Sequence, residues 1–219
     1  VRKELHKILW SSFFYIFVNV ILKSRTMRTL KLLALLLLIS TFANAQQNIK
    51  IGDIYTFEDN TQGVVFYIDE EGHGLAVSLT QEKRRWADET NYVYCQDIVN
   101  IPNDPLPNFE FQSGLGKLNT SYILQQLGAK KPTAAKYCRE LGEEWYLPTA
   151  SEFYKLLLGN VDGKVNKTLT ENKCKPIMGW YWTSSEYDNG QAWTINSFGR
   201  FKKGSKLSYR HIARAIRKF

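Results

Sequence analysis

One segment, residues 142–193, constrains the fold more than any other, because it places a helix start directly ahead of two strands. Pro148 disfavours helical backbone at the residue before it, and Thr149 and Glu152 have the spacing of a capping box. The apolar residues that follow recur at the spacing of one helix face: Phe153, Leu156 and Leu157. The pattern predicts a short helix over residues 149–158 that packs one face inward.

Two strands are predicted after this helix, joined as a hairpin. Residues 179–186 begin with aromatic and β-branched side chains that favour a strand, residues 184–190 are turn formers, and residues 191–198 alternate like a partly buried strand. This part of the chain holds four of the six tryptophans: Trp145, Trp180, Trp182 and Trp193. Two interpretations stay open: the rings pack in the core and the hairpin, or they form an aromatic surface for a ligand.

A set of short motifs recurs in a fixed order along the chain. They are SGLGKLNT at 113–120, AAKYC at 134–138, WYLPT at 145–149 followed by Glu152, YWTSSE at 181–186, AW at 192–193 and RAIR at 214–217. The set resembles the domain that ends the Lcl-type collagen-like bacterial adhesins, over roughly residues 51–219. That domain, of unknown function, belongs to the C-type-lectin-like group of folds, which also contains the formylglycine-generating enzymes. The resemblance implies an α+β, C-type-lectin-like fold with antiparallel strands and two to three helices. It implies no single function, because one fold hosts many activities.

Local patterns predict the remaining elements. Three strands at 51–57, 63–68 and 75–79 are separated by short turns, which favours an antiparallel meander, and residues 81–112 are predicted to be mostly loop. The other predicted elements are a helix over 121–127 capped by Asn119 or Thr120, a helix from Pro132 or Thr133 to Leu141, a polar surface insertion at 162–176, and a final strand within 209–219 that pairs near the N-terminal one.

Residues 27–45 have the pattern of a secretory signal peptide. A basic stretch at 27–31 precedes an apolar stretch at 32–39, and the ANA at 43–45 fits the small-x-small cleavage rule. The alternative is an N-terminal membrane anchor. The apolar stretch is short for that role, since a span needs about 20 apolar residues.

Residues 1–26 lie upstream of this signal peptide, and we interpret them as a mis-annotated leader, with Met27 as the true start. The alternative is a second membrane segment at 8–22, which is strongly apolar. Residues 46–219 are then a single exported domain, located in the periplasm, on the cell surface or in the medium.

Charge in this exported domain is almost balanced. The whole chain carries a formal net charge of +8, but residues 46–219 contain 22 basic and 20 acidic residues. This balance gives no general electrostatic case for nucleic acid or a membrane as partner, and no stable membrane span is expected in the domain. The basic residues within 209–219 are either a patch for acidic ligands or part of the final strand, with Arg214 and Arg217 in structural roles.

No metal, cofactor or catalytic site is predicted. His73 lies in a glycine-flanked turn without partners nearby in the sequence, and no spaced acidic motif indicates calcium. Three cysteines allow one disulfide after export. We would pair Cys95 with Cys174, because both lie in loops, and we interpret Cys138 as a buried small apolar residue.

The function that we expect is non-enzymatic binding or adhesion, with a glycan or a surface protein as partner. The predicted binding surface comprises loops 81–112 and 160–190, with these candidate contact residues: Trp86, Trp180, Trp182, Tyr187 and Asn189. One alternative, implied by the resemblance, is an oxidase of the formylglycine-generating type, which would need copper and a reactive cysteine pair. The other is a structural subunit of a surface assembly.

The leader interpretation gives a first prediction. Mass spectrometry of peptides from the expressing bacterium should find Gln46 as the first residue of the exported protein, because cleavage is expected after Ala45. Peptides from residues 1–26 in the same cells would contradict the assignment of Met27 as the start.

Overall fold

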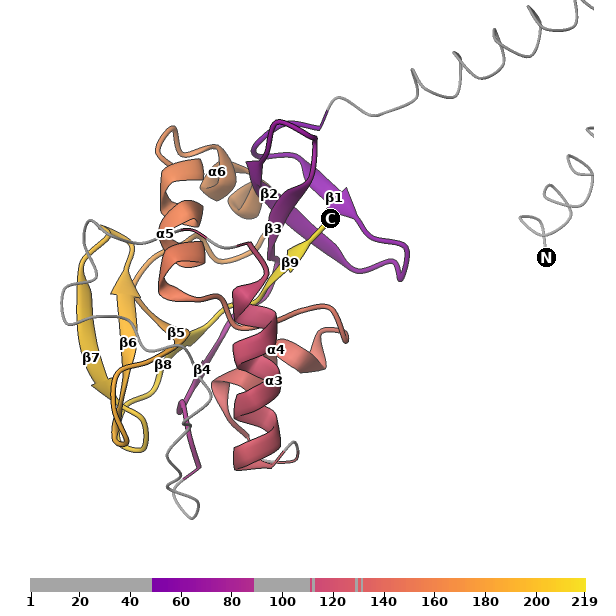
Figure 1. Cartoon of the computed structure of the whole chain (residues 1–219). Helices are drawn as coiled ribbons and strands as arrows, with labels where there is room; N and C mark the ends of the chain where they lie inside the picture. Colours follow the sequence, from indigo (N-terminus) through magenta and orange to yellow (C-terminus); the bar gives the residue numbers. More distant parts are fainter. Residues whose placement is uncertain (1–48, 89–110, 112, 129, 131) are drawn as a thin grey trace, which may run out of the picture. The chain divides into compact units, whose positions relative to one another are not determined.

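The computed structural model describes residues 49–88, 111, 113–128, 130 and 132–219. The predicted leader, the signal peptide and most of the loop at 81–112 lie outside the described residues. Residues 49–219 form a unit of their own, in which the described part contains two sheets and four helices (Figure 1). None of these helices is long and apolar enough to cross a membrane. The fold class is α+β, as predicted, with one helix more than expected.

The first sheet has four antiparallel strands in the order β1-β2-β3-β9. Its strands are β1 (Ile54–Thr56), β2 (Gln62–Ile68), β3 (Gly74–Ser78) and β9 (Ile216–Lys218). The first three strands confirm the predicted meander. The end of the chain pairs with β3, with Arg217 opposite Ala76, so it joins the N-terminal sheet as expected.

The second sheet has five strands in the order β4-β8-β5-β6-β7. Its strands are β4 (Glu82–Arg84), β5 (Trp180–Glu186), β6 (Gln191–Asn196), β7 (Phe201–Ser205) and β8 (His211–Ala213). The β5–β6 pair confirms the predicted hairpin, and the β5–β8 pair is parallel. The expectation of a partly buried β6 is wrong at its centre, where the four residues 192–195 are all buried.

The four helices pack against these sheets. They are α3 (Leu115–Leu127), α4 (Ala134–Glu140), α5 (Ala150–Gly159) and α6 (Lys164–Glu171). Helix α5 confirms the predicted capping box, since the Thr149 hydroxyl accepts from the Glu152 amide and the Glu152 carboxylate accepts from the Thr149 amide. It contacts β2 of the first sheet and β5 and β6 of the second, so it lies between the two sheets (Figure 1). Helix α4 begins after Thr133, as predicted.

Two helix predictions need correction. Helix α3 begins at Leu115, so Asn119 and Thr120 are buried inside it instead of capping it. The Thr120 hydroxyl accepts from the Leu147 amide at 3.0 Å, which explains why a polar residue is buried there. The predicted surface insertion contains α6, which is helical because Val165 and its i+4 neighbour Leu169 bury one narrow apolar face.

Consecutive strands β8 and β9 belong to different sheets, and Arg214 lies at the crossing between them. Its buried guanidinium donates to the carbonyls of Ser78 at 2.9 Å and Lys175 at 2.7 Å, and to the Gln81 side chain at 2.8 Å. This confirms the structural role predicted for Arg214. Arg217 binds the Asp59 carboxylate and is also structural.

The Glu152 carboxylate is fully buried and accepts four hydrogen bonds. Oε1 accepts from the Gly114 amide at 2.7 Å and the Tyr146 hydroxyl at 3.0 Å. Oε2 accepts from the Gly116 amide at 3.2 Å and the Thr149 amide at 2.9 Å. Burial raises the pKa of this carboxyl, while the hydrogen bonds from Thr149, Gly114 and Tyr146 act in the opposite direction.

Replacing this carboxylate should destabilise the domain. In Glu152→Gln, an NH2 group replaces one carboxylate oxygen and faces the two donors that this oxygen accepted from. We therefore expect the free energy of unfolding to fall by about 2–4 kcal/mol in urea titrations. The matched control is Glu144→Gln, because Glu144 is exposed and pairs only with Lys117 at the surface. Its cost should be below about 1 kcal/mol. Equal losses in the two variants would contradict the role given to Glu152.

Candidate functional site

Two of the predicted contact residues, Trp86 and Trp182, lie in the core. Their rings are almost completely buried, and each indole N–H donates to a backbone carbonyl, Thr183 for Trp86 at 2.9 Å and Arg84 for Trp182 at 2.8 Å. A tryptophan can be buried at low cost when its one polar group is satisfied in this way. These two residues therefore follow the core interpretation and present no ring face to solvent.

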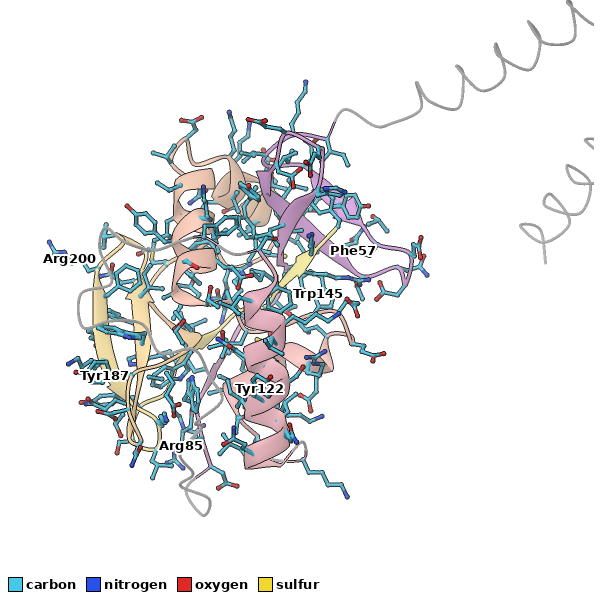
Figure 2. All side chains as sticks on the ribbon, viewed as in Figure 1. Phe57, Arg85, Tyr122, Trp145, Tyr187 and Arg200 are labelled. Carbon is cyan, nitrogen blue, oxygen red and sulfur yellow. The ribbon has the colours of Figure 1, made fainter. Side chains whose placement is uncertain are left out.

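Trp180 and Tyr187 lie at opposite ends of β5. Trp180 pairs with Asn196 at one end, and the Tyr187 amide donates to the Gln191 carbonyl beyond the other end. Figure 2 shows Tyr187 at the end of the β6–β7 pair that is remote from Arg200. Asn189 is exposed in the turn beside Tyr187. The predicted residues thus do not form one surface: Tyr187 and Asn189 are together, and Trp180 is elsewhere.

Trp180 belongs to a group of side chains around His211, which we call the His211 cluster. Its members are Trp180, Trp182, Lys202, Tyr209 and His211. The imidazole centroid lies 4.8 Å from the Trp182 ring, 5.6 Å from the Tyr209 ring and 6.4 Å from the Trp180 ring. The Lys202 ammonium lies 4.1 Å from the centroid of Trp180. Trp180 is half-buried and Tyr209 exposed, so the cluster reaches the surface.

The imidazole of His211 is held in its neutral form. Burial lowers its pKa from the ordinary 6.5 to about 4, and the positive charges of Lys202 and Lys83 act in the same direction. Its Nε2 atom is buried and has no hydrogen-bond partner among the described residues. A neutral imidazole has one donor and one acceptor nitrogen, and because Nε2 is buried, Nδ1 is the nitrogen left for a ligand beside the rings of Trp180 and Tyr209. That combination suits recognition of hydroxyl-rich ligands such as sugars.

Tyr187 belongs to a different group, the Tyr187 cluster, formed with Trp193 and Lys203. The two aromatic rings meet edge to face at 5.3 Å, and the Lys203 ammonium lies 3.6 Å from the Tyr187 centroid. Trp193 is buried, so this cluster exposes mainly Tyr187 and Lys203.

A buried ion pair lies close to the Tyr187 cluster. Lys206 and Glu186 are fully buried and in direct contact, and the Lys206 ammonium also donates to the Asn189 carbonyl at 3.2 Å. The ammonium lies 4.6 Å from the centroid of the buried Trp86 ring, within the range of a cation–π contact. Sequence reasoning missed this pair and His211, because no local spacing joins Glu186 to Lys206 or His211 to Trp180.

The β2–β3 turn contains the one group of described residues with metal-ligand chemistry: Asp69, Glu71 and His73. The His73 Nδ1 atom lies 3.6 Å from a carboxylate oxygen of each of the two acids. The expectation that His73 lacks nearby partners is therefore wrong, although the residue lies in an exposed turn, which agrees with its glycine-flanked sequence. Asp69 Oδ1 already accepts from the Glu71 and His73 amides, so the turn is ordered by its own hydrogen bonds.

The described cysteines are Cys138 and Cys174, and both are free thiols. Cys138 is fully buried, as predicted, and burial raises its pKa far above the ordinary value. Cys138 belongs to the core cluster that contains Trp145, whereas Cys174 packs at the edge of a second core cluster, which contains Phe153 and Tyr181. The Cys174 Sγ lies 3.3 Å from the Asn172 carbonyl. Cys95 lies outside the described residues, so its pairing with Cys174 stays a prediction.

Comparison with known proteins shows similarity of fold but not of sequence. No protein-family model matches the chain, and no curated protein matches it. Its fold is similar to the crystal structure of a fimbrial protein from Bacteroides ovatus, with a TM-score of 0.51 and 16% sequence identity. The similarity covers 78% of this chain and 48% of that protein, so this chain spans about half its length.

The environment of His211 gives a pH prediction. In NMR titrations its imidazole should titrate near pH 4, below the ordinary 6.5, because burial and two lysines oppose protonation. Since the folded-state pKa is the lower one, its contribution to stability is complete above pH 6.5 and is lost as the pH falls towards 4.

In the variant His211→Gln, the free energy of unfolding in urea should fall less between pH 6.5 and pH 4 than in the parent protein. A His211 midpoint near 6.5 would show that the imidazole is solvated and that the described cluster does not form.

Proposed function

We propose that this protein is an exported, non-enzymatic binding module of the bacterial surface, with an adhesive role. The observation that supports this most directly is the similarity of its fold to a fimbrial protein. The signal-peptide pattern at 27–45 supports export. The ordered motifs that resemble the Lcl-type adhesin domain support a C-type-lectin-like topology within the α+β fold.

The ligand that we propose is a glycan, bound at the His211 cluster. Sugars stack their apolar faces on aromatic rings and hydrogen-bond through their hydroxyls. Trp180 and Tyr209 supply accessible rings, and His211 supplies a neutral polar group between them. A protein ligand at the same cluster is the runner-up, because exposed aromatic residues also anchor protein interfaces.

Two alternatives have different requirements. An oxidase of the formylglycine-generating type needs a reactive cysteine pair, whereas Cys138 is buried with a strongly raised pKa and Cys174 borders a different core cluster. A thiol count with copper titration tests this alternative. A structural subunit of a surface assembly is favoured by the fimbrial fold similarity. Size-exclusion chromatography that shows only monomer at high concentration would count against it.

A glycan-array screen of the exported protein tests the proposal. We expect selective binding that Trp180→Ala weakens by at least about tenfold, because an aromatic anchor at a binding site contributes strongly. Tyr187→Ala is the matched control: it removes an aromatic ring from the same strand pair at its remote end and should leave binding unchanged. Trp182→Ala is unsuitable, because loss of a buried tryptophan costs about 3–5 kcal/mol of stability.

The outcomes separate the possibilities. Loss of binding in Tyr187→Ala but not in Trp180→Ala would move the site to the Tyr187 cluster. No binding across the array by a folded protein would exclude the glycan ligand and favour a protein partner or a structural role.

A further inference from the structure

A second surface lies where the β6–β7 turn approaches α5. Phe198, in this turn, is 87% exposed, and Met178, just before β5, is 69% exposed. The Ser197 amide donates to the Gly179 carbonyl at 3.1 Å, so these two segments are adjacent. Tyr154 of α5 lies 3.4 Å from the position that a Cβ on Gly199 would occupy. We call this surface the Phe198 patch; it comprises Tyr154, Leu158, Met178 and Phe198.

The turn that presents Phe198 is held in one conformation. The Asn196 side-chain oxygen accepts from the Phe198 amide at 3.0 Å and from the Arg200 amide at 2.9 Å. The backbones of Asn196 and Arg200 also bond at 3.0 Å, and Gly199 has a positive φ of 76° that closes the turn. The exposed ring is therefore displayed on an ordered support, which lowers the conformational entropy that a contact would cost.

The segments that carry the patch contain basic side chains. The three segments that form it, residues 153–161, 172–179 and 196–201, contain no acidic residue, although Asp162 and Glu171 directly flank two of them. Their basic residues are Lys155, Lys173, Lys175 and Arg200. Residues 46–219 as a whole carry 22 basic and 20 acidic residues, so these three segments are richer in basic residues than the domain is on average.

We propose that the Phe198 patch docks on an anionic lipid surface. Phe198 and Met178 would enter the apolar boundary below the headgroups, and the surrounding basic side chains would contact lipid phosphates. Peripheral proteins that bind at this boundary combine exposed apolar side chains with lysine and arginine. The proposal goes beyond glycan binding at the His211 cluster, since the two surfaces can act independently and hold a surface module close to a membrane.

Vesicle co-sedimentation of the exported protein tests this. Vesicles of phosphatidylcholine with 30% phosphatidylglycerol (an assay composition of roughly cellular charge density) should retain the protein, and pure phosphatidylcholine should retain much less. Phe198→Ser should lower partitioning by at least about tenfold, because it removes one large apolar side chain from the interface. Arg200→Gln should lower it about fivefold and weaken its salt dependence.

Two matched control variants test whether a loss of vesicle binding is specific to the Phe198 patch. Leu118→Ser removes an exposed apolar residue from α3, and Lys130→Gln removes an exposed charge beyond that helix; both should bind vesicles like the parent protein. Trp180→Ala should also bind normally, which separates this result from the glycan test. Circular dichroism confirms that each variant is folded.

Three results would overturn the proposal. One is a folded parent protein that does not sediment with anionic vesicles. Another is unchanged vesicle binding in Phe198→Ser. The third is a loss of self-association in Phe198→Ser, seen by sedimentation velocity without a change in vesicle binding, because the patch would then be a contact between copies of this chain.

Discussion

The buried carboxylate of Glu152 is the interaction on which the arrangement of the helices depends. It binds backbone amides at the starts of both α3 and α5, and it binds the Tyr146 hydroxyl. Tyr146 in turn exchanges two backbone hydrogen bonds with Ile216 of β9, each 3.0 Å long. One negative charge therefore connects two helix N-termini, where partial positive charge accumulates, to the sheet. Gly116 is required for this contact, since a Cβ there would lie 2.5 Å from Glu152 Oε2.

The sequence is a good guide where structure is decided within a few residues. The capping box of α5, the Thr133 cap of α4, the meander and the β5–β6 hairpin each follow from neighbouring side chains, and each was predicted correctly. Helix α3 was placed too late because its first amides are satisfied by Glu152, more than thirty residues away. Helix α6 was missed because its sequence is polar apart from Val165 and Leu169, whose partners come from distant elements.

Much less of the candidate site could be predicted. Aromatic composition identifies tryptophans but not their exposure, which for Trp86 and Trp182 depends on carbonyl partners that are distant in the sequence. The β5–β6 register is irregular between Trp182 and Glu186, in the part of the strand that separates Trp180 from Tyr187. No local sequence pattern indicates this irregularity. The Phe198 patch could not be predicted either, because residues 178 and 198 become neighbours only through the Ser197–Gly179 hydrogen bond.

The crossing of the chain between the sheets at Arg214 has a consequence for when the domain can fold. Strands β8 and β9 lie within the last nine residues, yet β4 is joined to its sheet only through β8, and β3 pairs with β9. Neither sheet can be completed before residues 211–218 have been synthesised. Contacts so distant in sequence also slow folding, because a large loop must close before they form. Residues 49–88 and 111–210 therefore cannot reach their final arrangement until strands β8 and β9 are available, and the export proposed above would need a chain that is still open.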